Sequence, residues 1–417
     1  MRGAFVRVTR LICLTVALSA AASAAGSEYQ ERRQALSKAL PRSVIVLFGR
    51  SAGSDDLSRF FQEPNFYYLT GWKQQGALVL IDPSREVLFL PQHDPDHEKW
   101  TGPQAAPGDA DISRVTGFDS VLPVERFESE LHASLDRWRT LYTVGDQARA
   151  QLRAFAPLRD VADPSREIAR LRMKKSQQEL ALLQRAADAT IAAHRAAWKQ
   201  AVPGVYEYQV AAGMVAVYAG LGCERSAYPP IVGSGPNSVY LHYEVNERRM
   251  DRGEILLVDV GAECAGYAAD VTRTVPVGGK FSTRQREIYE IVLGAQKAAI
   301  AAAKPGVTVG NKTPNSLYKV AYDYINSHGK DLHGESLGKY FTHGIGHHVG
   351  LEVHDASDTT APLEEGMVIT IEPGIYIPEE NIGIRLEDMV LITKQGARVL
   401  TAALPREAGD IEKALAP

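Results

Sequence analysis

The stretch Ile255–Asp270, with the sequence ILLVDVGAECAGYAAD, decides the fold of the second half of this chain. Its first four residues are apolar and typical of a buried strand, and Asp259 follows them directly. Asp270 lies eleven positions further on, beyond two glycines that favour a turn. If the hairpin turns at Cys264-Ala265, the two aspartates lie directly opposite each other, with Cβ atoms about 4.5–5.5 Å apart. The stretch therefore predicts a hairpin whose two carboxylates can bind one cation.

The stretch Val368–Glu387, with the sequence VITIEPGIYIPEENIGIRLE, repeats this arrangement. The largely apolar run Val368-Ile369-Thr370-Ile371 precedes Glu372, and Glu387 follows fifteen positions later. A Gly/His-rich segment between the two stretches contains His347. For any one of these acids alone, a solvated strand end is an equally good interpretation, but the paired spacings favour a shared site.

Four crowded carboxylates repel one another and raise one another's pKa unless cations neutralise them. Four oxygen ligands and one imidazole suit Mn²⁺, Co²⁺ or Zn²⁺ better than a thiolate-seeking metal. The sequence therefore predicts a hydrolase centre with two divalent ions, Mn²⁺ first among the three.

The composition limits the class of protein. The chain has 417 residues, 23% charged and 45% hydrophobic, which is enough for two domains with buried cores. A net charge of −4 gives no indication of a nucleic-acid partner. After the first 25 residues no stretch approaches the roughly 20 apolar residues of a membrane span, so no membrane partner is expected there.

The N-terminus has the pattern of a secretory signal peptide. Three arginines precede the apolar stretch Leu11–Ala22, and the small residues Ala22-Ser23-Ala24 follow. Residues 1–25 are predicted to be cleaved after Ala24 or Ala25, and the mature protein is predicted to be exported, periplasmic or secreted. An uncleaved membrane anchor is the alternative.

Cys223 and Cys264 remain after such cleavage and are too few for a disulfide-based fold. The sequence leaves open whether they pair. Because Cys264 falls in the predicted turn between the two aspartates, no functional role is expected of it.

The chain is predicted to divide near residue 165, at Asp163-Pro164. Short β-like runs alternate with turn-rich and helical segments before this point. Residues 27–165 are therefore predicted to form a smaller α/β domain.

The second part, residues 170–410, contains two long helical stretches in similar contexts. The first begins with a capping box at Ser176–Glu179 and ends at Pro203-Gly204-Val205. The second runs from Thr283 to Lys304 and ends at Pro305-Gly306-Val307. Each leads into further helix and then into one of the acidic hairpins. This part is therefore predicted to be an α+β domain of two related halves, with the metals at their shared centre.

These motifs resemble, in type and order, those of the pita-bread metallopeptidases, and of the aminopeptidase P (Xaa-Pro aminopeptidase) branch in particular. In the first domain, Asn65–Gly71 followed by Ala77–Leu80 resembles the N-terminal-domain signature of that branch. In the second domain the motifs that carry the resemblance are Ile231–Gly235, Leu241–Tyr243, Thr342–Gly344, Val353–Asp355, Glu372–Gly374 and Ile384–Asp388. The resemblance implies a pita-bread catalytic domain with an internal two-fold repeat, preceded by an aminopeptidase P-like domain.

The resemblance also implies the metal ligands. Asp270 and Glu387 bridge both ions. Asp259 completes one metal site, and His347 with Glu372 completes the other. A water between the ions is the implied nucleophile, and Glu372 is the implied base that passes its proton to the leaving nitrogen.

Four further residues have implied roles in catalysis. His354 is placed to stabilise the oxyanion of the tetrahedral intermediate, and His242 and His343 to position the substrate. Arg385 lies two residues before Glu387, and it is expected to hold carboxylates by bidentate hydrogen bonds.

An alternative alignment makes His343 the metal ligand, because the residues from His343 to Gly346 resemble the metal-binding stretch of methionine aminopeptidases. In this superfamily the ligand histidine is followed seven residues later by a second catalytic histidine. His347 and His354 have that spacing, whereas the residue seven positions after His343 is Gly350. His347 is therefore the predicted ligand.

The implied substrates are peptides with proline in second position, cleaved between the first residue and proline. A prolidase that cuts only Xaa-Pro dipeptides shares the fold and the ligands and is the main alternative. A metal-free binding protein or a creatinase-like amidinohydrolase on the same scaffold would lack several ligands. The resemblance also allows a homo-oligomer, although the sequence locates no interface.

A separate cluster in the first domain gives one more alternative. The cluster consists of His93, Asp94, Asp96, His97 and Glu98. The favoured interpretation is a solvated loop, and the alternative interpretation is a second metal site.

Overall fold

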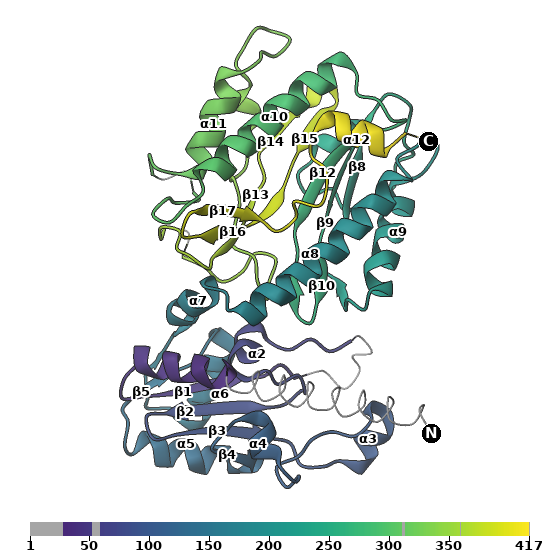
Figure 1. The fold of residues 1–417 in the computed structure, drawn as a ribbon. Helices are drawn as coiled ribbons and strands as arrows, with labels where there is room; N and C mark the ends of the chain where they lie inside the picture. The colour runs from purple at the N-terminus through teal and green to yellow at the C-terminus, as the bar shows by residue number, and fades with distance from the viewer. Residues whose placement is uncertain (1–27, 52–58, 311–312, 359, 417) are drawn as a thin grey trace, which may run out of the picture. The chain divides into compact units, whose positions relative to one another are not determined.

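The computed structural model describes residues 28–51, 59–310, 313–358 and 360–416 (Figure 1). The chain forms two compact units that divide between Leu171 and Arg172, inside helix α7 (Ser165–Met173). The predicted signal peptide lies outside the described residues. Among the helices that are described, none is long and apolar enough to cross a membrane.

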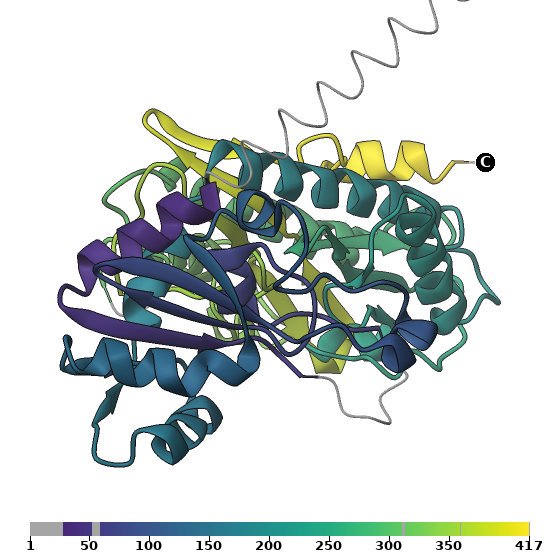
Figure 2. The ribbon, with the colours of Figure 1, turned by 90° about the horizontal axis from the view of Figure 1, so that it is seen from below.

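The first unit contains a six-stranded mixed sheet with the order β4-β3-β2-β1-β5-β6. The three central strands β1, β2 and β3 are antiparallel neighbours, and the outer pairings are parallel. Helices lie on both faces of the sheet (Figure 2). One face packs Val46, Leu80 and Phe89 against Phe127 and Leu131 of α5. The elements of this unit are a helix over residues 28–39, β1 (Ser43–Phe48), α2 (Pro64–Thr70), β2 (Leu78–Asp82), β3 (Arg85–Leu90), α3 (Pro95–Thr101), α4 (Ile112–Thr116), β4 (Ser120–Pro123), α5 (Phe127–Leu135), β5 (Thr140–Tyr142), α6 (Asp146–Phe155) and β6 (Val161–Ala162).

The second unit confirms the predicted repeat of two helices followed by a hairpin. In the first half, α8 and α9 pack against each other and lead into the hairpin of β9 and β12. In the second half, α10 and α11 pack together and lead into the hairpin of β13 and β16. The elements of this unit are α8 (Gln177–Trp198), α9 (Glu207–Gly220), β7 (Arg225–Ser226), β8 (Ile231–Ser234), β9 (Ile255–Val260), β10 (Ala262–Cys264), β11 (Tyr267–Ala268), β12 (Val271–Pro276), α10 (Thr283–Ala302), α11 (Leu317–Ser327), β13 (Val368–Ile371), β14 (Gly374–Ile377), β15 (Ile382–Arg385), β16 (Asp388–Thr393), β17 (Gly396–Val399) and α12 (Ala408–Ala414).

The two long helices begin at matching caps. Ser176 and Glu179 form the predicted capping box of α8, in which each side chain accepts a hydrogen bond from the other residue's backbone N–H. Ser282 and Gln285 form the same box at α10.

The first acidic hairpin turns one residue later than predicted. Ala265 and Gly266, with φ of 54° and 84°, form its turn, because a two-residue hairpin turn of this kind needs positive φ at both positions. Asp259 therefore pairs with Thr272, and the prediction that it lies directly opposite Asp270 was wrong. The two aspartates are diagonal neighbours on one face of the hairpin.

The second acidic hairpin has the predicted geometry. Ile371 pairs with Asp388, and Gly374 pairs with Arg385. The same register places Glu372 opposite Glu387.

Arg273 of β12 joins the two hairpins. Its guanidinium is fully buried and donates to Asp388 Oδ1 at 2.7 Å and to the Glu387 carbonyl at 2.6 Å. The Glu387 amide in turn donates to the Thr272 carbonyl at 3.1 Å. These contacts place the carboxylates of the first half beside those of the second.

Replacing Arg273 by methionine is expected to lower the free energy of unfolding of the second unit by about 3–5 kcal/mol, because Asp388 loses the main partner of its buried charge. Denaturant unfolding followed by tryptophan fluorescence measures the change. The matched control is Arg286→Met, whose partner Glu412 is part-exposed, and which should cost about 1 kcal/mol or less. Equal losses for both variants would contradict this role of Arg273.

Candidate metal centre

One cavity of about 460 Å³ in the second unit brings together all the residues that the sequence predicted for the site. Its walls come from both acidic hairpins, from the segment after β8 and from the loop that follows residue 342. The predicted residues that line it are His242, Asp259, Asp270, His343, His347, His354, Glu372, Arg385 and Glu387.

Three of the predicted ligands form the tightest group. Asp270, His347 and Glu387 each present one potential ligand atom, and these atoms lie within 4.8 Å of one another. His347 Nε2 lies 3.3 Å from Asp270 Oδ2 and 3.6 Å from Glu372 Oε1. This group includes His347 and not His343.

Asp259 is held in the same cavity by two donors. Arg385 Nη2 donates to its Oδ2 at 2.5 Å, and the Tyr228 hydroxyl donates to its Oδ1 at 2.5 Å. The same hydroxyl contacts Asp270 Oδ1, so Tyr228 joins the two diagonal aspartates.

The contacts of Arg385 differ from the expected bidentate grip on a carboxylate. Its Nη1 donates to the Tyr376 hydroxyl at 2.8 Å and its Nε to Thr272 Oγ1 at 3.2 Å. Only Nη2 reaches a carboxylate, that of Asp259. Arg385 therefore ties Asp259 to the second hairpin, with one charge-assisted bond rather than two.

Comparisons with known proteins agree with this geometry. A model of metallopeptidase family M24 matches residues 181–394, and a model of the aminopeptidase P N-terminal domain matches residues 29–142. The chain belongs to metallopeptidase family M24. The predicted resemblance and the predicted pita-bread fold are thereby confirmed.

Individual M24 proteins resemble this chain over most of its length. The Xaa-Pro aminopeptidase of Haemophilus influenzae is 32% identical over 418 residues, which cover 92% of this chain and 96% of that protein. The Xaa-Pro dipeptidase of Pyrococcus furiosus is 34% identical over 354 residues, covering 82% and 92%. The structure of aminopeptidase P from E. coli with the inhibitor Pro-Leu has a TM-score of 0.82 at 30% identity, covering 94% and 98%.

The electrostatics of this M24 site fit a cationic cofactor. Burial, together with the charges of Asp270 and Glu372, raises the pKa of Glu387 well above its usual range. Burial also raises the pKa of Glu372, to about 7. Burial opposes protonation of His347, but Asp270 and Glu372 outweigh it and raise its pKa to about 9. Without a metal ion, bound protons compensate the negative charge of these groups. Divalent ions would compensate it more fully, and the donors suit Mn²⁺, Co²⁺ or Zn²⁺.

The remaining histidines lie around the predicted metal ligands. The His354 ring packs edge-on against the His347 ring, with centroids 4.2 Å apart. His343 Nδ1 contacts its neighbouring Gly344 carbonyl at 2.8 Å, and its Nε2 lies 2.8 Å from the Tyr376 hydroxyl. Burial and nearby Arg385 lower the pKa of His343 to about 4, so this histidine is neutral. His242 lines the cavity and is exposed to it.

Sequence reasoning missed several residues of the site. Tyr228, Tyr376 and Thr272 contact the predicted residues directly; Thr272 Oγ1 donates to Glu387 Oε2 at 2.7 Å. Tyr228 follows β7, and no pattern in the sequence separates it from the other tyrosines of the chain. Tyr376 lies between two isoleucines inside β14, and Thr272 lies inside β12, where a packing role is the ordinary expectation for both.

The cluster of acidic residues and histidines in the first unit was predicted to be a solvated loop. It instead forms the start of helix α3. Asp94 caps α3 by accepting from the amides of Asp96 and His97. His93 is exposed and uses both ring nitrogens, toward Glu98 at 2.8 Å and Asp109 at 2.9 Å. These residues therefore cap the helix and form hydrogen bonds at the surface, which explains why they cluster.

Binding of Mn²⁺ is expected to strengthen as pH rises from about 6 to 8. His347, with its pKa near 9, holds a proton throughout this window, and Glu372, with its pKa near 7, loses one within it. These protons compete with the metal at low pH, and each displaced proton changes the apparent Kd about tenfold per pH unit. Calorimetric titration of metal-free protein in buffers of different ionisation enthalpy measures both the Kd and the protons released. A Kd that is independent of pH would contradict the assignment.

Proposed function

We propose that this M24 member is a dinuclear-metal aminopeptidase that removes the first residue from peptides with proline in second position. The observation that carries the proposal is the single cavity lined by all the predicted ligands and catalytic side chains. Relatives named as Xaa-Pro aminopeptidases, which match nearly the whole chain including its first unit, support the substrate class. Two Mn²⁺ ions are proposed, with Co²⁺ or Zn²⁺ as alternatives, because the donors are four carboxylates and one imidazole.

The metal ions, when bound, would lower the pKa of a water molecule and polarise the scissile carbonyl. Glu372 accepts a proton in this proposal and delivers it to the proline nitrogen. That delivery matters because the Xaa-Pro bond is a tertiary amide, whose nitrogen must gain a proton to leave as an amine. The raised pKa of Glu372, about 7, suits a group that both takes and gives a proton near neutral pH.

The other side chains bind and orient. His354 is proposed to donate to the developing oxyanion, since its ring lies directly against the ligand His347. His242 and His343 are proposed to position the peptide from the cavity wall. Arg385 acts through Asp259, whose carboxylate it holds in place.

A strict prolidase is the alternative, because the chain also resembles an Xaa-Pro dipeptidase over most of its length. The two activities differ in whether the cavity admits a chain beyond proline. A metal-free binding protein is disfavoured, because all five predicted ligands are present in the cavity.

Mass spectrometry of Mn²⁺-loaded protein with an Xaa-Pro dipeptide and a matched Xaa-Pro-Pro peptide tests the proposal. Release of the first residue from the longer peptide is expected, and Glu372→Gln should lower kcat about 10²–10⁴-fold by removing the proton carrier. The matched control is Glu379→Gln, an exposed glutamate in the turn of the same hairpin, which should leave the rate unchanged. Chelation should abolish the reaction.

The outcomes separate the alternatives. Cleavage of the dipeptide alone would make the protein a prolidase. Cleavage of neither peptide would favour the binding protein.

Export is proposed from the N-terminal pattern of residues 1–25. A disulfide between Cys223 and Cys264 supports this, because disulfides persist mainly in oxidising compartments. The homo-oligomer stays a prediction.

Expression of the full chain in a bacterium with two membranes tests export. The protein is expected in the periplasmic fraction, and N-terminal sequencing should start at Ala25 or Gly26, after removal of the signal peptide. A chain without residues 2–25 is the control and should stay in the cytoplasm. A membrane-bound chain that retains Met1 would instead identify an uncleaved anchor.

A further inference from the structure

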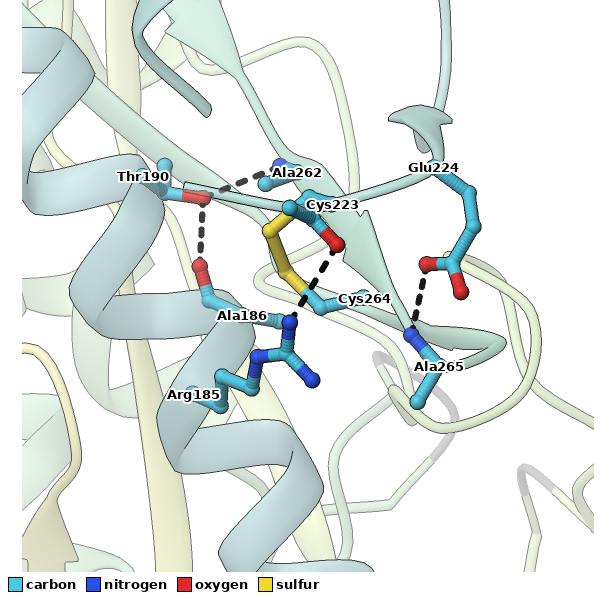
Figure 3. Close-up of a disulfide and its surroundings, with 9 residues drawn as sticks. Arg185, Ala186, Thr190, Cys223, Glu224, Ala262, Cys264 and Ala265 are labelled. Carbon is cyan, nitrogen blue, oxygen red and sulfur yellow. Dashed lines mark hydrogen bonds between the residues drawn. A yellow bond between two sulfur atoms is a disulfide. The ribbon is translucent and has the colours of Figure 1, made fainter. Parts of the chain in front are cut away.

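The disulfide joins Cys223 to the hairpin that carries two of the proposed metal ligands. Cys264 ends β10, between Asp259 and Asp270 in the chain, and Cys223 follows α9. Figure 3 shows the disulfide beside α8, with Arg185 and Thr190 of that helix next to it. Both cysteines are buried, and the sequence analysis expected no role for Cys264.

The residues after Cys223 run along β10 toward the metal centre. The Glu224 amide donates to the Glu263 carbonyl at 2.9 Å, and the Ala227 amide donates to the Gly261 carbonyl at 2.8 Å. The next residue is Tyr228, whose hydroxyl contacts both aspartates. We call residues 223–228 the bracing segment. One of its ends is fixed by the disulfide, and its other end contacts the ligands.

The hairpin behind the bracing segment has a fixed position. Thr190 Oγ1 of α8 accepts from the Ala262 amide at 2.9 Å. Gly261 lies so close to the Ala269 carbonyl that a Cβ atom would meet its oxygen at 1.7 Å. The hairpin thus offers a rigid surface, and the position of Tyr228 depends on how firmly the bracing segment lies on it.

Noncovalent contacts also hold the end of the bracing segment that is remote from Tyr228. The Cys223 amide donates to the Tyr218 carbonyl at 3.1 Å, and Ser226 contacts the Tyr218 hydroxyl. Arg225 forms an ion pair with Glu263 at 2.8 Å. The strand of the bracing segment, β7, has only two residues. Beyond the β7 pairing, Glu224 accepts from the Ala265 amide at 2.6 Å, and Arg185 donates to the Gly222 carbonyl at 3.2 Å. The Arg185 contact is exposed, so water can replace it, and the Glu224 contact is part-buried, whereas the disulfide is covalent and buried.

We infer that the Cys223–Cys264 disulfide is a positioning element of the metal centre. It holds the bracing segment on β10, so that the Tyr228 hydroxyl keeps Asp259 and Asp270 at the spacing that binds divalent cations. A chain with two free thiols binds these cations more weakly. The inference rests on the proposed metal centre.

The disulfide can form by thiol–disulfide exchange with oxidised glutathione. The two cysteine thiols give up two protons and two electrons, and one oxidised glutathione takes them up to become two reduced glutathiones. Full metal affinity therefore requires folding in an oxidising compartment or buffer.

Calorimetric titration of metal-free full chain with Mn²⁺ tests the inference. The protein is prepared in oxidising and in reducing glutathione buffers, its thiols are counted by mass spectrometry, and the glutathione is removed. Mn²⁺ is the right probe because it prefers oxygen ligands, so the freed thiols create no competing site. Since outer contacts to metal ligands typically affect affinity 10–100-fold, the thiol form should bind Mn²⁺ about tenfold more weakly.

Variants separate positioning from general stability. The double variant Cys223→Ser/Cys264→Ser should match the thiol form in both buffers. Ile325→Ala creates a cavity beside α11, which lowers the melting temperature but lies outside the hairpin. This variant should leave the Kd unchanged. Tyr228→Phe should make the Kd independent of the disulfide, because the disulfide acts through this hydroxyl.

Equal Kd values for the disulfide and thiol forms would overturn the inference, whatever their melting temperatures. If the double variant fails to fold, the two forms of the unmodified chain still give the comparison. Peptide cleavage by the disulfide form is scored separately, so failure of the proposed function is distinguishable from failure of this inference.

Discussion

Four carboxylates share one buried cavity, and the need to compensate their negative charge governs the rest of the catalytic unit. Burial raises the pKa of Asp259, Glu372 and Glu387, so each pays a desolvation penalty when ionised. The chain itself supplies few compensating groups: Arg385 on Asp259, and His347 beside Asp270. The remaining negative charge can be balanced only by protons or by cations, which is why the site suits divalent metals.

The two halves of the repeat meet this requirement together. Asp270 comes from the first hairpin, while Glu387 and the loop residue His347 come from the second half, and the atoms that could bind a metal lie within 4.8 Å of one another. Neither hairpin alone could assemble that group. Arg273 makes the junction possible, because its buried guanidinium satisfies Asp388 and the Glu387 carbonyl at the point where the halves touch.

Much of this arrangement could be predicted from the sequence, because its strongest signals are local. Apolar runs ended by acidic residues indicated β9 and β13, and capping residues indicated the start of α8. The error in the first hairpin was avoidable, since Ala265-Gly266 offers a glycine where the turn needs positive φ and Cys264-Ala265 does not.

Tyr228 was beyond local reasoning for a different reason. Its role depends on β7 pairing with β10, a contact between segments more than thirty residues apart in the chain. No periodicity or spacing near Tyr228 records that pairing. The disulfide was likewise left open, because two cysteines show only that a bridge can form and not that the chain brings them together.

The two acidic hairpins differ in the side chains that contact their carboxylates. Glu372 and Glu387 lie in register between the pairs Ile371–Asp388 and Gly374–Arg385, although both glutamates lie outside the strands. Each accepts a hydrogen bond from a different hydroxyl, Glu372 from Thr370 and Glu387 from Thr272. Asp259 and Asp270 are diagonal, and Asp270 also lies outside the strands. One hydroxyl, that of Tyr228, contacts both of these aspartates. The bracing segment therefore gives the first hairpin a contact that spans its two carboxylates, whereas the two glutamates of the second hairpin have separate hydroxyl partners.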